Sequence, residues 1–253
     1  MRFKIVAATA ALSLAAVGAI AAAGAGSAAA QPSARASLPK PTVPQISGSR
    51  LQTGLLPASA FGAGFTPGTT LNTGSGLLST TSATQNGPAT SCSTFEGKIY
   101  VSGFGNTSGA LAEYVNPNAA MQRPEAIMQG FQDVIQFATA TAATTFFAQA
   151  RAKYAACLSF SEPNPTDTNP GGGTFQISTI GVSKTTVSGD AAFSVTQQVA
   201  LSERPGATEF VDVLYAVAGT DVYSMWQQSG TNDQPSATAM ASLIKKIQAL
   251  YPH

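Results

Sequence analysis

The sequence has very little of the residue types on which most enzyme chemistry depends. Its 253 residues include one histidine, His253, and two cysteines, Cys92 and Cys157. Serine- and cysteine-based catalytic arrangements need a positioned imidazole, and zinc sites need several His or Cys ligands. We therefore expect no catalytic residue of these kinds and no metal ion.

Charged residues are also few. The chain carries 13 Lys and Arg against 12 Asp and Glu, a formal net charge of +1, and its longest run of like charges is Lys245-Lys246. This pattern excludes a positively charged surface that binds nucleic acid or an anionic membrane. The glycine-rich stretches "GAGFTPG" and "GFGNTSG" miss the Gly-x-Gly-x-x-Gly spacing of a phosphate-binding loop, so no cofactor is expected.

The N-terminus has the pattern of a secretory signal peptide. Arg2 and Lys4 precede an apolar, Ala-rich run, and small residues at 28–30 suit a cleavage site after about Ala30. The first cysteine, Cys92, lies too far downstream for a lipoprotein anchor. We expect an exported, extracellular protein with residues 1–30 removed and no stable membrane insertion.

Beyond the signal peptide, the sequence predicts a spacer followed by one domain. Residues 31–50 contain four prolines and little that is apolar, which is typical of an extended spacer that does not pack. Residues 51–253 are long enough for one domain with a full core. In its first part, Leu55–Phe65 predicts one or two helical turns, residues 66–90 read as loop, and Ser93–Phe104 predicts a strand.

Two later segments predict amphipathic helices. Ala142–Leu158, with Thr139 or Thr141 as its N-cap, carries one apolar stripe, made by Phe147, Ala150, Tyr154 and Cys157. Pro235–Leu250 has an apolar side made by Met240, Leu243, Ile244 and Ile247, and Lys245 and Lys246 lie near its C-terminus, where cations are favourable.

The remaining segments predict an antiparallel sheet. Four strand-like runs joined by short turns form a meander: Thr174–Val182, Ala191–Glu203, Ala207–Ala218 and Thr220–Gln228. The third run is apolar on both faces, which predicts a central strand. Gln132–Ala138 favours a further strand, and Ser161–Gly173 reads as loop. The predicted fold is α+β, an antiparallel sheet packed against at least two helices.

The two cysteines predict a disulfide. An exported protein with two cysteines forms a disulfide if geometry allows, and closing the 65 residues between Cys92 and Cys157 is worth about 4 kcal/mol in the chain-entropy model. The rival interpretation, a catalytic thiolate, needs a base and partial exposure. Cys157 falls on the apolar stripe of its helix, so the disulfide Cys92–Cys157 is the prediction.

Carboxylates leave one enzymatic alternative open. Asp212 lies among apolar residues and Asp221 close by in the sequence, so Asp212 could have a raised pKa and act as an acid in glycan hydrolysis. The plainer interpretation is that Asp212 points outward at the sheet edge or satisfies a turn. Tyr215, Tyr223 and Trp226 could line a ligand groove, although such aromatic residues more often belong to the core.

The order of elements resembles a known family. "LLPASAFGAGF", the cysteine of "SCSTF", "VIQFATATAATTFFAQARAKYAAC", the strands and the final "ATAMASLIKKIQALYP" are together similar to the PknH-like extracellular sensor domain of actinobacterial receptor kinases and stand-alone secreted proteins. The resemblance implies an α+β domain with a groove for an unidentified ligand and no catalytic activity. This sequence has one cysteine pair where family members often have two disulfides, and Tyr154 stands where Trp is common.

From this resemblance and the missing catalytic groups, we expect a secreted, non-enzymatic, sensor-like domain. Its groove would recognise a small molecule or cell-envelope component, and the ligand-binding residues are not predicted. Two alternatives remain: a secreted hydrolase that uses carboxylates such as Asp212, and a protein-interaction module of the cell surface.

Overall fold

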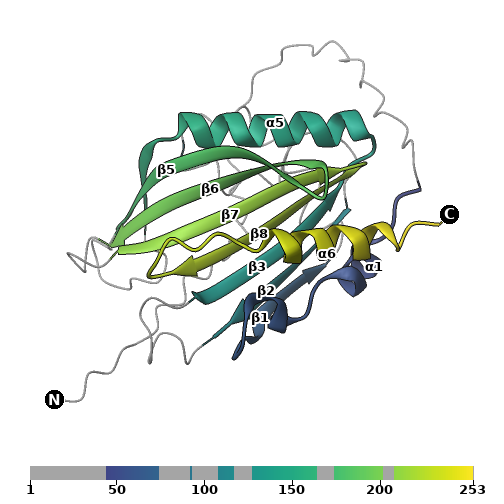
Figure 1. Ribbon diagram of the computed structural model, residues 1–253, viewed down its shortest axis with the longest axis horizontal. Helices are drawn as coiled ribbons and strands as arrows, with labels where there is room; N and C mark the ends of the chain where they lie inside the picture. The colour runs from purple at the N-terminus through teal and green to yellow at the C-terminus, as the bar shows by residue number, and fades with distance from the viewer. Residues whose placement is uncertain are drawn as a thin grey trace, which may run out of the picture.

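The computed structural model describes residues 44–73, 92, 108–116, 127–163, 174–201 and 208–252. Eight strands form one antiparallel sheet in the order β1-β2-β3-β8-β7-β6-β5-β4 (Figure 1). The bounds are β1 Thr66–Thr73, β2 Ser108–Val115, β3 Ile127–Gln136, β4 Ser159–Pro163, β5 Thr174–Val187, β6 Asp190–Leu201, β7 Thr208–Ala218 and β8 Asp221–Ser229. The predicted meander is confirmed as β5 to β8, and β7 lies inside the sheet between β6 and β8.

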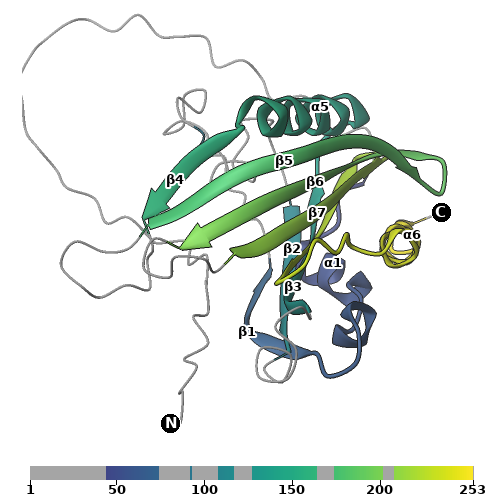
Figure 2. The same cartoon turned by 60° about the vertical axis from the view of Figure 1, so that its left-hand side comes forward.

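Helices cover both faces of this sheet, as Figure 2 shows for α5 and α6. They are α1 Gly48–Gly54, the 3₁₀-helix η1 Ala58–Phe61, α5 Ala140–Ala156 and α6 Ala237–Gln248. Thr139 caps α5 by accepting a hydrogen bond from the Ala142 N–H, and Ser236 caps α6 in the same way through the Ala239 N–H. The predicted α+β fold and both predicted long helices are confirmed.

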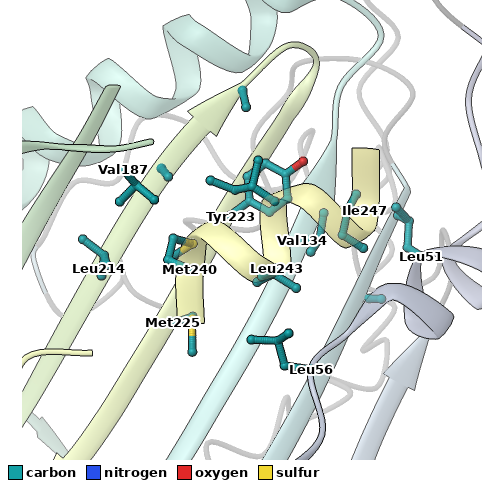
Figure 3. Close-up of a cluster of buried hydrophobic side chains, with 14 of the residues drawn as sticks. Leu51, Leu56, Val134, Val187, Leu214, Tyr223, Met225, Met240, Leu243 and Ile247 are labelled. Atoms are coloured by element: carbon teal, nitrogen blue, oxygen red, sulfur yellow. The ribbon is translucent and has the colours of Figure 1, made fainter. Parts of the chain in front are cut away.

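One core lies between the sheet and α6, α1 and η1. The apolar side of α6 buries Met240, Leu243 and Ile247 against β3 and β8, where Val134 and Tyr223 are fully buried (Figure 3). Because strand side chains alternate between faces, every second residue of β3, β8 and β7 contributes to this layer.

The second core lies between the other sheet face and α5. Phe147 of α5 meets Phe193 of β6 with ring centroids 5.0 Å apart, and Phe193 stacks on Tyr215 of β7 at 4.8 Å. Directly after α5, the buried Cys157 forms the predicted disulfide with Cys92, their Cα atoms 5.5 Å apart. The bond ties the C-terminal end of α5 to a residue 65 positions earlier in the chain.

The structure corrects several predictions for the N-terminal part of the domain. Ile46 is buried and α1 begins at Gly48, so the end of the 31–50 segment packs instead of serving as spacer. Strand β1 occupies part of the region 66–90, which was read as loop, and pairs with β2. The strand predicted at 93–104 lies outside the described residues.

Two further differences concern the lengths of secondary-structure elements. The segment Ser161–Gly173 was predicted as loop, but Ser161–Pro163 belong to β4, because their main chain pairs with β5. The helix expected in Leu55–Phe65 is limited to the four residues of η1, since Gly62 ends it with a φ of 126°, a conformation that favours glycine.

Candidate functional site

A groove of about 580 Å³ lies on the α6 side of the sheet. One wall is η1, the other is the linker 230–236 that joins β8 to α6, and the floor comes from Met225 and Gln227 of β8. Its volume lies within the range of roughly 300–1,000 Å³ of small-molecule sites. The groove is therefore large enough for a small ligand.

Gln227 is the unusual residue of this groove. The residue is only 6% exposed and lines the groove, and its amide makes no hydrogen bond to the described residues. Its neighbours across the sheet are Gly130 and Asp212. Its amide atoms are not among the fully buried polar atoms that lack a partner, so the amide is open to the groove and can donate to and accept from whatever occupies it.

Gly130 makes room for the wall beside Gln227. A Cβ at Gly130 would lie 2.4 Å from Cδ1 of Phe61, so the aromatic ring of η1 rests directly on the glycine backbone. Phe61 also meets Tyr114 with ring centroids 5.3 Å apart. The position of η1, and with it one wall of the groove, depends on the missing side chain at 130.

Asp212 holds the other wall. Its Oδ1 accepts hydrogen bonds from Oγ1 of Thr196 at 2.7 Å and from Nε2 of Gln234 at 2.5 Å, and its Oδ2 accepts one from the Asp233 N–H at 2.8 Å. Burial raises the pKa of Asp212, and the Thr196 hydrogen bond opposes this rise. Asp212 is 1% exposed, so it does not point outward, and it anchors the linker 230–236.

Asp212 and Asp221 are too far apart to act as a catalytic pair. Asp221 pairs with Ala218, six residues beyond Asp212 along β7, and six strand residues span about 20 Å. Glycosidase carboxylates are separated by roughly 5–9.5 Å. The structure therefore does not bring together the two acids that the sequence singled out.

Asp221 instead lies in a closed network under α6. Its oxygens accept hydrogen bonds from the hydroxyls of Tyr251 at 2.6 Å and Tyr223 at 3.1 Å, and Gln136 donates to the Tyr251 hydroxyl. Burial raises the pKa of Asp221 to about 6, while the Tyr251 and Tyr223 hydrogen bonds act against burial. Asp221 is 1% exposed and lines neither groove of this face.

A second groove of about 400 Å³ lies beside the segment between α1 and η1. Lys246 and Tyr114 line it, together with residues 55–57. The hydroxyl of Tyr114 donates to the Leu56 carbonyl at 2.5 Å, and Gln132 donates to the same carbonyl at 2.7 Å. The Tyr114 hydroxyl of this groove thus already binds the chain's own backbone.

The aromatic residues considered from the sequence do not line these grooves. Tyr215 and Tyr223 are core residues on opposite faces of the sheet. Trp226 lies on the α5 face and stacks on Phe131 with ring centroids 3.6 Å apart. The groove residues Phe61 and Gln227 were not predicted; the short helical signal around Phe61 and the acid Asp212 behind the linker were the traces of this site in the sequence.

The part of the chain that the structure describes contains no group of three or more His, Cys, Asp or Glu residues placed to hold a metal ion. Among the same residues, no helix is both long and apolar enough to span a membrane.

Comparison with known proteins supports the fold and little else. No family model and no curated protein matches the sequence. Among solved structures, the crystal structure of the extracellular domain of PknH from Mycobacterium tuberculosis is similar, with a TM-score of 0.51 and 13% sequence identity. The match covers 83% of this chain and 98% of that one. The chain therefore has a PknH-like fold, as the resemblance implied.

Proposed function

We propose that this chain is a secreted, non-enzymatic, sensor-like domain that binds a small molecule or cell-envelope component in the groove between η1 and the linker 230–236. The observation that carries the proposal is Gln227, a largely buried residue whose amide opens onto the groove and makes no hydrogen bond to the described residues. The PknH-like fold supports an extracellular role, as does the signal-peptide pattern of residues 1–30.

The two alternatives have less support. A hydrolase would need an available acid, whereas Asp212 is engaged by Thr196, Gln234 and the Asp233 backbone. A protein-interaction module would expose an apolar patch, whereas the described residues expose two large apolar side chains, Leu158 and Ile180.

The proposal is tested by identifying what the protein carries. We expect mass spectrometry of protein extracted gently from culture medium to find a bound small molecule in the wild type. Gln227→Trp, which fills the groove with an indole, should abolish it, and Gln176→Trp, at an exposed position of β5, should not.

Equal amounts of the molecule with both variants would contradict this site. No bound molecule in any preparation, and no uptake from an envelope extract, would contradict the function. Glycan turnover that is lost in Asp212→Asn would favour the hydrolase instead.

A further inference from the structure

The groove between η1 and the linker 230–236 has an unusual charge balance. Asp233 is its only charged lining residue, and no Lys or Arg lines it among the described residues. Oδ2 of Asp233 accepts a hydrogen bond from Oγ1 of Thr231 at 2.5 Å. A carboxylate without a lining cation disfavours an anionic ligand.

The N-terminus of α6 offsets this negative charge. Ser236 caps the twelve-residue helix and lines the same groove. Aligned peptide dipoles give a helix N-terminus about half a positive elementary charge. The helix N-terminus therefore partly cancels the charge of Asp233, and the small net charge that remains suits a neutral molecule.

The uncharged polar groups of the groove both donate and accept hydrogen bonds. Gln227 offers an amide N–H₂ and a carbonyl, and Ser59 offers a hydroxyl on the η1 wall. The Ser236 hydroxyl accepts from the Ala239 N–H at 3.2 Å and still has its hydrogen to donate. Ligand hydroxyls, which also donate and accept, match this set, while Met225 and Phe61 supply apolar surface for C–H groups.

We propose that the groove takes a neutral, polyhydroxylated ligand, a carbohydrate group, with the Gln227 amide as its central hydrogen-bonding partner. This inference rests on the proposed function and adds the chemical class of the ligand. It makes Gln227 a specificity-determining residue, because a side chain without donors would leave the sugar hydroxyls unpaired.

The experiment is an NMR titration of the full chain, labelled with ¹⁵N, with trehalose and N-acetylglucosamine as neutral probes, spermidine as a cation and inorganic phosphate as an anion. The Gln227 side-chain amide signals are assigned by their absence from the spectrum of Gln227→Leu. We expect a sugar to shift these signals, and Gln227→Leu to weaken its binding about tenfold, measured on the backbone signals of η1. Gln176→Leu is the matched control, with unchanged affinity.

The outcomes separate this inference from the proposed function. Shifts of the Gln227 signals by phosphate or spermidine, and not by the sugars, would overturn the ligand class and keep the groove. The ligand class would likewise be overturned, and the groove kept, if no probe binds while mass spectrometry finds a bound molecule. Sugar binding that is equally strong in Gln227→Leu would overturn the role of Gln227, and absence of any ligand in both experiments would overturn both proposals.

Discussion

Buried glutamine side chains decide which main-chain segments lie on the α6 face. Oε1 of Gln132 accepts from the Leu56 N–H at 2.9 Å, and its Nε2 donates to the Leu56 carbonyl at 2.7 Å. Oε1 of Gln136 accepts from the Ile46 N–H at 2.8 Å. Both side chains are fully buried and satisfy backbone groups as a neighbouring strand would. Gln227 on the same face has no such partner, which distinguishes the groove from the rest of this layer.

The carboxyl of Asp221 makes the stability of the protein depend on pH in a definite direction. Its pKa is about 6 in the folded protein, above the ordinary value of 3.8, because it is buried. Between these values the folded state holds more protons than the unfolded state. The contribution of Asp221 to stability is therefore fully present below about pH 4 and is lost, by about 3 kcal/mol, as the pH rises through 6. The raised pKa of Asp212 acts in the same direction.

We predict that Asp221→Asn removes most of this dependence. An amide does not ionise, so the free energy of unfolding of the wild type should fall by about 3 kcal/mol relative to the variant between pH 4 and pH 7. Urea unfolding at several pH values measures it. Asp190→Asn, at the first residue of β6, controls for the change in net charge. Parallel curves for the wild type and Asp221→Asn would show that Asp221 does not titrate as described.

At the scale of secondary-structure elements, the sequence predicted the strands and helices whose own residues show a recognisable pattern. Strands β5 to β8 are runs of strand-forming residues separated by turn residues, and α5 and α6 combine an apolar side with a capping residue, so local chemistry is enough to specify them. Strand β1 and helix α1 lack such a signal. Their positions depend on tertiary partners, such as the glutamine side chains of β3 that bind Ile46 and Leu56, and no local pattern encodes those bonds.

The candidate site was predictable only in part for the same reason. An acid among apolar residues predicted a raised pKa for Asp212, and the direction is confirmed. The predicted outward orientation of Asp212 was wrong, because the linker 230–236 folds back over it, but the other interpretation agrees with the structure, since Asp212 accepts a hydrogen bond from the Asp233 N–H of that linker. Gln227 gave no signal, since glutamine in a strand usually faces solvent. Its burial depends on η1, which packs over Gly130, and this contact joins residues far apart in the sequence.

The packing of η1 leads to a prediction about one methyl group. Gly130→Ala places a Cβ 2.4 Å from the Phe61 ring, so the ring and η1 must move away from the sheet. Overpacking of this kind costs about 1–3 kcal/mol, and we expect urea unfolding to show that loss. Gly181→Ala is the matched control, because its Cβ would meet no atom within 4 Å. Equal stability of the two variants would contradict the close packing of Phe61 on Gly130.

At the scale of the whole molecule, segments from both ends of the domain meet in one network. Gln136, the last residue of β3, binds the Ile46 N–H and the hydroxyl of Tyr251. Nη2 of Arg50 in α1 donates to the carbonyl of Leu250 at 2.6 Å, a bond between residues 200 positions apart. Such connections couple the early and late parts of the domain, so we expect both sheet faces to unfold in one cooperative transition.

Tyr251→Phe tests this coupling. The change removes the hydroxyl that donates to Asp221, so the free energy of unfolding at pH 7 should fall by about 1–3 kcal/mol, and by less at pH 4, where the carboxyl is protonated. The only tryptophan, Trp226, lies on the opposite, α5 face and reports by fluorescence, while circular dichroism reports on the whole chain. If the domain is one cooperative unit, the unfolding midpoints measured by fluorescence and by circular dichroism shift together. They should also coincide in Tyr154→Phe, the matched change on the α5 face. A fluorescence midpoint that stays in place while the dichroism midpoint moves would show that the two faces unfold separately.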